Sequence, residues 1–384
     1  MSQPSTHPAG MPGSVLIVGG YGVVGSRIAA GLAADFPGRV LIAGRHLDRA
    51  EATAAAIGHG VRGRRIDVTV PSSIAAALDG VSVAVNCIDQ PERGLLWAAI
   101  QRGLAYTDIT PHLTDLGRGA GYERVDAAAR AAGARILLGA GMVPGISSVL
   151  VRALAEELGG ADQIETSLLL SADDTSGPGS FDYLLQELTM GFDVYIDGTD
   201  RRARPFTAPR IVAYPAPAGP RRAYLFPFSD QVLYPRTLGA RTVITRLSVD
   251  PPRMSRLLSL LASTGAAHLA AQPRLRAAAG RLRQRRTAAD KAARYALRVD
   301  VQHTGRAATA TLTGDGQAYA TATGTAALVR SLASGEVAQP GAWMPEQVIE
   351  PGPFLDRLAL AGLRVEFAIP ADTGTAGQRP SMPA

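Results

Sequence analysis

Short apolar runs alternate with alanine-rich helical segments over the first 140 residues. Val15–Val18 is an apolar, β-branched run of the kind that a buried parallel strand requires. Five further strands are expected at Arg39–Ala43, Arg65–Val68, Val81–Cys87, Ala105–Ile109 and Arg135–Leu138. Helices are expected between them at Ser26–Phe36, Ser72–Leu78, Glu92–Gly103 and Tyr122–Ala132. Strands that alternate with helices in this way indicate a doubly wound parallel sheet.

The pattern changes after Gly141. Pro144-Gly145 opens a helix that extends to Leu158, and longer segments with alternating polar and apolar residues follow. These segments are Gln163–Ser171, Arg210–Tyr214, Ala223–Phe226, Thr242–Ser248, Leu297–His303 and Ala307–Thr313. Together they predict a mostly antiparallel sheet that carries some helices. A last helix is expected over Tyr319–Leu332.

The first predicted strand runs directly into a glycine-rich turn. Gly20, Gly22 and Gly25 fit the pattern G-x-G-x-x-G between a strand and a helix, the context in which that pattern indicates a dinucleotide site. Gly20 permits the tight turn, Gly22 lets the backbone approach a pyrophosphate, and Gly25 lets the helix pack closely. The helix N-terminus then offers free N–H groups and a favourable dipole to the diphosphate. The alternative is a plain glycine-rich turn, which the second strand at the correct distance disfavours.

The end of the second strand bears on the choice of coenzyme. Domains that bind NAD usually place a carboxylate there to hold the ribose 2′-hydroxyl. This chain has Gly44, Arg45 and His46 instead. A small residue followed by arginine leaves room for a 2′-phosphate and supplies a permanently charged partner. We therefore expect NADP(H), with NAD as the alternative if Arg45 only stacks on the adenine.

Ligands of such sheets bind beyond the carboxyl ends of the strands. That rule places Asp67 beside the adenine, where it could accept a hydrogen bond from the amino group, and it places Asn86, Cys87 and Ile88 beside the nicotinamide. The expected coenzyme-binding residues are thus Gly20, Tyr21, Gly22, Val23, Val24, Gly25, Arg45, His46, Asp67, Asn86, Cys87 and Ile88.

Composition limits the class of protein. A chain of 384 residues is longer than one hydrophobic core usually serves, and 46% hydrophobic with 19% charged residues is typical of a folded protein. No apolar run approaches the ~20 residues that span a bilayer. Cys87 is the single cysteine, which excludes an internal disulfide and a cysteine-built zinc site. We expect a cytoplasmic protein without a metal, since the pair Asp173 and Asp174 has no histidine nearby.

The net charge of +6 does not by itself indicate nucleic-acid binding. Of the 39 basic residues only Lys291 is a lysine, and the one dense run is Arg274–Arg286. That run could hold a phosphate backbone, but a solvated helix face is the simpler interpretation, and no nucleic-acid-binding motif accompanies it. It would also suit docking of an acidic carrier protein.

Several segments together resemble the saccharopine dehydrogenase-like reductases. They are the turn Gly19–Gly25, the strand end Ala43–Arg45, Gly103–Asp108, Gly141–Gly145, Ala318–Ala322 and Gly341–Glu346, and the resemblance runs from Val15 to about Glu366. It implies hydride transfer between a nicotinamide and a C–N or, in some relatives, a C=C bond. It also implies a homodimer. The chain departs from the lysine-forming enzymes, which use a catalytic lysine, because Lys291 lies in a predicted surface segment.

The resemblance further implies a Rossmann domain that C-terminal elements complete around an inserted substrate domain. The expected class is α/β, a Rossmann doubly wound parallel sheet with an inserted α+β domain. The expected parts are a flexible leader at 1–13, the Rossmann domain at 14–142, a substrate and dimerisation domain at 143–317, returning elements at 318–368 and a disordered tail at 369–384.

Few residues are suited to acid–base chemistry. Tyr106 and Asp108 lie at the carboxyl end of a predicted strand, and His112 follows in the same loop and titrates near neutrality. These three are the expected catalytic residues, while structural roles stay open for each. Asp182, Tyr183 and Tyr234 could reach the substrate from the second domain.

The sequence therefore predicts an NADP(H)-dependent oxidoreductase that acts on an imine or carbonyl bond of a small metabolite, in specialised metabolism rather than on saccharopine. Two other functions stay open: an enoyl reductase that acts on a carrier-bound substrate, and a non-catalytic NADP(H) sensor.

Overall fold

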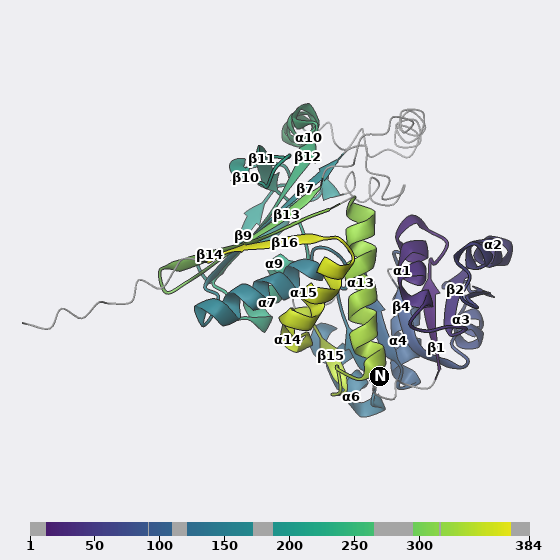
Figure 1. The fold of residues 1–384 in the computed structure, drawn as a ribbon. Coiled ribbons are helices and arrows are strands. Elements are labelled where there is room, and N and C mark those ends of the chain that lie inside the picture. Colours follow the sequence, from purple (N-terminus) through teal and green to yellow (C-terminus); the bar gives the residue numbers. More distant parts are fainter. Residues whose placement is uncertain are drawn as a thin grey trace, which may run out of the picture.

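A computed structural model describes residues 13–90, 92–109, 121–171, 187–264, 295–314 and 316–369. Two sheets organise these residues (Figure 1). The first has seven strands in the order β15-β6-β5-β4-β1-β2-β3, all parallel. Its strands are β1 Ser14–Val18, β2 Val40–Gly44, β3 Arg62–Arg65, β4 Val81–Asn86, β5 Ala105–Asp108, β6 Arg135–Leu137 and β15 Gly341–Trp343.

Helices cover both faces of the first sheet, which confirms the predicted doubly wound arrangement. In β1, the side chains of Val15 and Ile17 pack on one face and those of Leu16 and Val18 on the other, so an uninterrupted apolar run is needed. One face packs against α1 Val23–Ala33, α2 Leu47–Ile57 and α13 Gln317–Ser334. The other packs against α3 Pro71–Ala77, α4 Gly94–Gln101 and α6 Gly121–Ala132.

The second sheet has nine strands in the order β10-β11-β12-β7-β13-β14-β16, with β8 paired to β12 and to β9. Its strands are β7 Gln163–Ser171, β8 Phe192–Ile196, β9 Thr199–Ala203, β10 Arg210–Ala213, β11 Pro220–Leu225, β12 Thr242–Asp250, β13 Ala296–His303, β14 Arg306–Thr313 and β16 Arg364–Ala368. All pairs are antiparallel except β7 with β12. The predicted α/β class with a second mixed domain is therefore confirmed.

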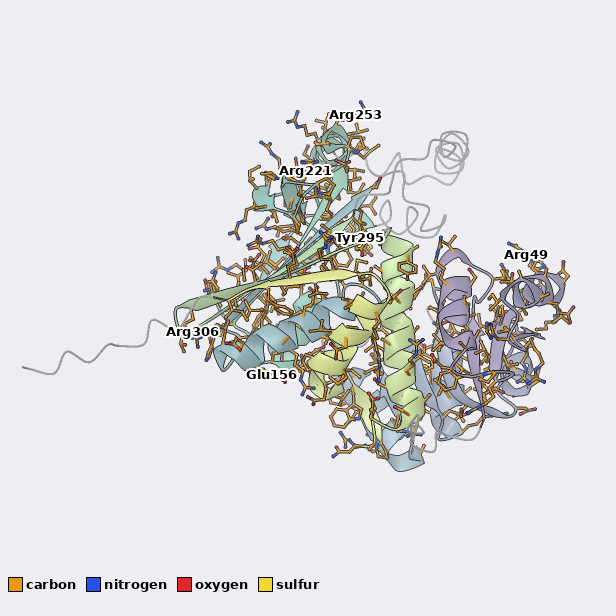
Figure 2. The ribbon with its side chains drawn as sticks, viewed as in Figure 1. Arg49, Glu156, Arg221, Arg253, Tyr295 and Arg306 are labelled. Atoms are coloured by element: carbon orange, nitrogen blue, oxygen red, sulfur yellow. The ribbon has the colours of Figure 1, made fainter. Side chains whose placement is uncertain are left out.

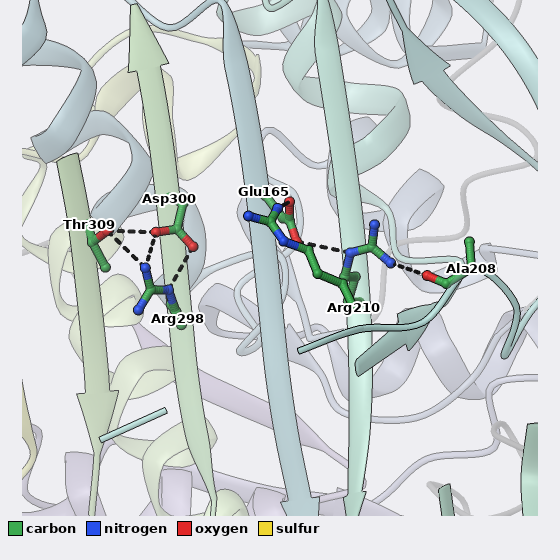
Figure 3. A network of polar contacts seen from close by, with 7 residues as sticks. Glu165, Ala208, Arg210, Arg298, Asp300 and Thr309 are labelled. Carbon is green, nitrogen blue, oxygen red and sulfur yellow. Dashed lines mark hydrogen bonds and ion pairs between the residues drawn. The ribbon is translucent and has the colours of Figure 1, made fainter. Parts of the chain in front are cut away.

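Helix α7 Ile146–Leu158 packs on one face of this sheet. The remaining helices of the second part are α9 Asp230–Thr237, α10 Pro252–Thr264, α14 Pro345–Val348 and α15 Pro351–Leu360. The face opposite α7 carries ion pairs (Figure 3). There Arg298 makes a two-point contact with Asp300, at 2.6 and 2.7 Å, and Arg246 contacts Glu165 at 2.9 Å. These ion pairs pair the charged side chains on that face. Among the described residues, no helix covers it as α7 covers the opposite face.

The structure corrects the sequence prediction at two places. The third strand comprises Arg62–Arg65 rather than Arg65–Val68, because Ile66 is buried against the helices of one face while Asp67 and Val68 turn away from the strand. The residues 318–368 do not all return to the first sheet. Helix α13 and β15 do, but β16 pairs with β14 in the second sheet.

Candidate coenzyme and active site

The turn after β1 combines a left-handed residue with close backbone contacts. Gly19 has φ +79°, and its N–H donates to Ala43 O at 2.9 Å. The motif predicts that Gly20 permits the tight turn, but the residue of the turn with a left-handed conformation is Gly19. Gly20 is required for space, since a Cβ there would lie 2.7 Å from Ile17 O and 2.9 Å from the Ile42 side chain.

Gly25 packs helix α1 against this turn. A Cβ on Gly25 would lie 2.4 Å from Gly19 O, a distance that no side chain allows. Gly22 is different, because the same test finds only Gly19 O, at 3.1 Å. A side chain on Gly22 would thus point into space that the described protein atoms leave open, where the motif expects the diphosphate.

The N-terminus of α1 faces the same space. Gly22 is the N-cap and provides no side-chain cap, and the first helical bond runs from Ser26 N–H to Gly22 O at 3.0 Å. The N–H groups of Val23, Val24 and Gly25 consequently have no acceptor within the helix. With no acidic residue in the first turn, this end of α1 suits an anion.

Tyr21 occupies the space that the sequence assigned to a phosphate. A Cβ on Gly44 would lie 2.3 Å from Tyr21 Cε1 and 2.7 Å from its hydroxyl oxygen. Gly44 is therefore small because the Tyr21 ring rests on it, and the expectation that Gly44 itself makes room for a 2′-phosphate is wrong. Arg45 and His46 follow directly and are exposed, so they can still reach a phosphate beside the ring.

Asp67 lies in the turn beyond β3. Its Oδ1 accepts hydrogen bonds from the N–H and hydroxyl of Thr69, at 3.0 and 2.7 Å. The Thr69 hydroxyl and N–H, and then the positive charges of Arg45 and Arg65, hold the pKa of Asp67 below its usual value. The carboxylate therefore stays ionised beside Arg45, where an adenine amino group could donate to it.

The segment after β4 closes on the glycine turn. The Asn86 side chain donates to Ile88 O at 3.0 Å and accepts from Ile88 N–H at 3.4 Å. A Cβ on Gly19 would lie 2.6 Å from Ile88 Cγ2, so Ile88 contacts the turn directly. Burial, and then the Asp108 charge, raise the pKa of the Cys87 thiol to about 12, so it is protonated at neutral pH.

Asp108 ends β5 opposite Asn86 and is nearly buried. Its Oδ1 accepts the Gly139 N–H at 3.0 Å, and its backbone carbonyl accepts the Ala140 N–H at 2.6 Å. The carboxylate therefore fixes the glycine-rich turn that leads from β6 toward α7.

Tyr106 is 3% exposed and packs among the helices on one face of the sheet. Burial raises its pKa, so its phenol stays protonated. This position favours a structural role over the predicted proton relay.

Other predicted residues lie outside the described part of the chain: His112, Asp173, Asp174, Asp182, Tyr183, Lys291 and the run Arg274–Arg286. Among the described residues, no group of histidine, cysteine and acidic side chains is arranged to hold a metal ion. Within the same residues, no helix is long and apolar enough to cross a membrane.

Tyr234 is fully buried, with its hydroxyl 3.2 Å from Ser147 Oγ and from Ser148 Oγ. Two buried carboxyl groups lie close to it, and nothing in their sequence neighbourhood predicts them. Burial raises the pKa of Asp230 to about 6, and Asp230 accepts from Thr245 Oγ1 at 2.7 Å. Burial also raises the pKa of Glu346, which accepts from Thr237 Oγ1 at 2.7 Å.

Comparisons with known proteins agree with this geometry. Residues 15–137 match the family model of the saccharopine dehydrogenase NADP binding domain. Apo saccharopine dehydrogenase (L-Glu forming) from Saccharomyces cerevisiae has the same fold, with a TM-score of 0.65 and 14% identity over 94% of this chain and 100% of that chain. GenD2 from gentamicin A biosynthesis, solved in complex with NAD, gives a TM-score of 0.42 and 15% identity over 96% and 99%.

No curated protein sequence matches the chain. The matched domain covers the glycine turn, the end of β2 and the edge at β4 and β5, which are the parts that form the site above. Residues 15–137 thus form a saccharopine dehydrogenase-type NADP-binding domain, and the protein is an NAD(P)-dependent oxidoreductase.

Proposed function

We propose that the protein transfers hydride between NADP(H) and a C–N or carbonyl bond of a small metabolite, in specialised metabolism. The observation that carries the proposal is the open anion site at Gly22 and the start of α1, with Arg45 exposed at the end of β2. The diphosphate would bind at the first, and the 2′-phosphate of NADP(H) at the second.

The bound coenzyme would supply or accept the hydride, and the chain would hold it. The N–H groups of Val23 and Val24 would donate to the diphosphate, and Asp67 would accept from the adenine amino group. Ile88, fixed by Asn86, would lie beside the nicotinamide at the carboxyl edge of β4. Residues 143–317 would bind the substrate over this edge, where the chain positions the reacting carbon.

Asp108 and His112 are the proposed groups on the substrate side. Asp108 already holds the turn at Gly139, so its carboxylate would position that turn as well as face a substrate cation. His112 follows β5 in the sequence and would give or take the proton at the nitrogen or oxygen of the reacting bond.

Calorimetric titration with NADPH and with NADH tests the coenzyme assignment. One charge-assisted contact in a partly exposed site predicts that NADPH binds at least about tenfold more tightly than NADH. Arg45→Ala should remove most of that difference by weakening NADPH alone. Arg62→Ala is the control, since Arg62 is an exposed arginine at the opposite, amino end of the same sheet. Equal affinities in the parent protein would contradict the NADP(H) assignment.

Turnover measurements test the catalytic roles proposed for Asp108 and His112. With NADPH and a panel of imines, ketones and enoyl compounds, Asp108→Asn and His112→Ala should each lower kcat much more than coenzyme affinity. Parent-like turnover in both variants would show that the two residues are structural. Reduction of only the enoyl compounds would favour a C=C reductase instead, and turnover with none of the panel would favour a sensor.

A further inference from the structure

Tyr21 and Arg49 form a contact at the end of β2 that the glycine motif does not require. The Tyr21 ring rests on Gly44, and the guanidinium carbon of Arg49 lies 4.8 Å from the centre of that ring. Arg49 is exposed in the first turn of α2, where Figure 2 labels it. A guanidinium over a tyrosine ring is held by cation–π attraction.

The contact brings the Arg49 guanidinium to the ring that rests on Gly44, the residue that precedes Arg45. Arg45 precedes α2 and Arg49 lies within it, so both flank the N-terminus of that helix, whose N-cap is His46. A cap residue without a side-chain bond leaves the first N–H groups of α2 available, and the helix dipole adds positive potential there. Two acidic residues lie near this positive charge: Asp48 in the first turn of α2, and Asp67, whose pKa is lowered chiefly by Thr69 and to a lesser extent by Arg45 and Arg65.

A guanidinium whose face is covered by an aromatic ring keeps its N–H groups at the edge, and those groups match two oxygens of a phosphate. Positioned in advance by the ring, it loses less conformational freedom when it binds than a free arginine would. A dianionic phosphate within reach of both Arg45 and Arg49 would be attracted by two positive charges, whereas a ribose hydroxyl, being neutral, would gain far less.

We propose that Arg49 is the second guanidinium of a 2′-phosphate site shared with Arg45, and that Tyr21 is the positioning residue that holds it. This inference rests on the proposed NADP(H)-dependent function. It assigns coenzyme discrimination to three residues of two elements, the glycine turn and the start of α2, and it gives the Tyr21 ring a role that the motif leaves undefined.

Calorimetry of NADPH and NADH with Arg49 variants tests the proposal. Arg49→Ala should weaken NADPH about tenfold and change NADH less than about twofold. Arg49→Lys should fall between, because lysine keeps the charge but not the two-point geometry. Tyr21→Leu should weaken NADPH selectively as well, while Tyr21→Phe keeps the ring and should bind as the parent does. Arg62→Ala should leave both affinities unchanged, and thermal melts should show all variants folded.

Three results would overturn the inference. Equal weakening of both coenzymes by Arg49→Ala would mean that Arg49 stacks on the adenine. No change in either would place Arg49 outside the site. A parent protein without any preference for NADPH would end both this inference and the NADP(H) assignment, whereas a preference that Arg45→Ala removes and Arg49→Ala does not would end this inference alone.

Discussion

Gly22 and Gly25 lie three residues apart in one motif, but their surroundings differ. Gly22 has φ −78° and ψ 172°, an extended conformation that any residue adopts, and a Cβ there would meet only Gly19 O, at 3.1 Å, a tight contact that a shift of a few tenths of an ångström relieves. Gly25 faces Gly19 O at 2.4 Å and Gly20 Cα at 2.9 Å, both backbone atoms that cannot move aside. Gly22 is thus expected to leave room for the ligand, whereas Gly25 is required for the packing of the turn against α1.

Gly22→Val should therefore fold and lose its coenzyme. The valine side chain would fill the path of the diphosphate and remove its contacts to the helix N–H groups, so NADPH affinity should fall at least about a hundredfold. Fluorescence titration measures the affinity, and a thermal melt within a few degrees of the parent shows that the fold is intact.

Gly25→Val is the matched substitution, which should fail to give a stable protein at all. A folded Gly22→Val variant with parent affinity would contradict the assignment of the diphosphate to this turn.

Asp230 is a second residue whose effect follows from its surroundings. It is completely buried, with Thr245 and the Gln231 N–H as donors and with the Glu346 carboxyl in the same cluster. Its pKa is raised from 3.8 to about 6, so the folded protein holds the neutral acid at a pH where the unfolded chain is already ionised. The stability this provides is complete below about pH 4 and is lost as the pH rises through about 6.

Between pH 4.5 and 7.5, this single group should lower the free energy of unfolding by about 2 kcal/mol. Urea unfolding of the parent and of Asp230→Asn at both pH values isolates the effect, since the asparagine cannot ionise. The stability difference between the two proteins should move by that amount in favour of the variant at the higher pH. A difference that stays constant would show that Asp230 does not change its protonation on folding.

Among the elements, α13 joins the two sheets. Most of its 18 residues are buried, and it packs against α1 on one side and near α7 and α15 on the other (Figure 1). Thr325 donates to Ala140 O at 2.6 Å, and Arg330 contacts Asp35 at 2.6 Å. Gly324 sets the approach to α7, because a Cβ there would lie 2.4 Å from Ile146 Cγ1.

Gly324→Val should destabilise the protein by about 1–3 kcal/mol through overpacking, and unfolding by denaturant measures this loss. Gly31→Ala is the control on the other side of α13, since its new Cβ would lie an ordinary 3.5 Å from Ala326. That substitution should be neutral or stabilising, as alanine favours a helix over glycine. An equal loss of unfolding free energy in both variants would mean that the close contact between Gly324 and Ile146 is not the cause of the destabilisation.

Elements with a strong local pattern were predictable from the sequence, and those defined by distant partners were not. The apolar run of β1 and the turn after it are local, so both were found. Strand β3, Arg62–Arg65, is polar because it forms the edge of its sheet, where charged residues are usual, so its sequence lacks the apolar pattern of a strand. Helix α9 contains Pro235 and has no regular apolar stripe, so the sequence pattern did not predict it.

The same distinction holds for the site. The glycines of the motif could be assigned because a tight turn needs them wherever it occurs. The Tyr21 ring on Gly44 and the buried carboxyl of Asp230 could not, because each depends on which side chains the fold brings beside it.

At the scale of the whole molecule, the two sheets share one core. A single cluster of buried residues contains Ile17 of the first sheet and Val243 of the second, and residues 341–368 supply a strand to each. Neither sheet can lose its structure without exposing apolar surface of the other.

We therefore predict one cooperative unfolding transition, with calorimetric and van't Hoff enthalpies that agree. NADPH at a hundred times its Kd should shift that whole transition, adding about 2.7 kcal/mol. Two transitions, of which NADPH moves only the first, would show that the sheets unfold independently.

The late position of β15 also has a consequence for synthesis on the ribosome. Strand β15 covers the edge of β6, yet roughly 200 residues separate the two strands, which at 5–20 residues per second corresponds to roughly 10–40 s of translation. During that time the N-terminal strands have already emerged while the β6 edge has no partner from its own chain. An unpaired edge can pair with other chains. The nascent protein is therefore most exposed to aggregation before Gly341–Trp343 leaves the ribosome, and a chaperone that binds during this interval would protect it best.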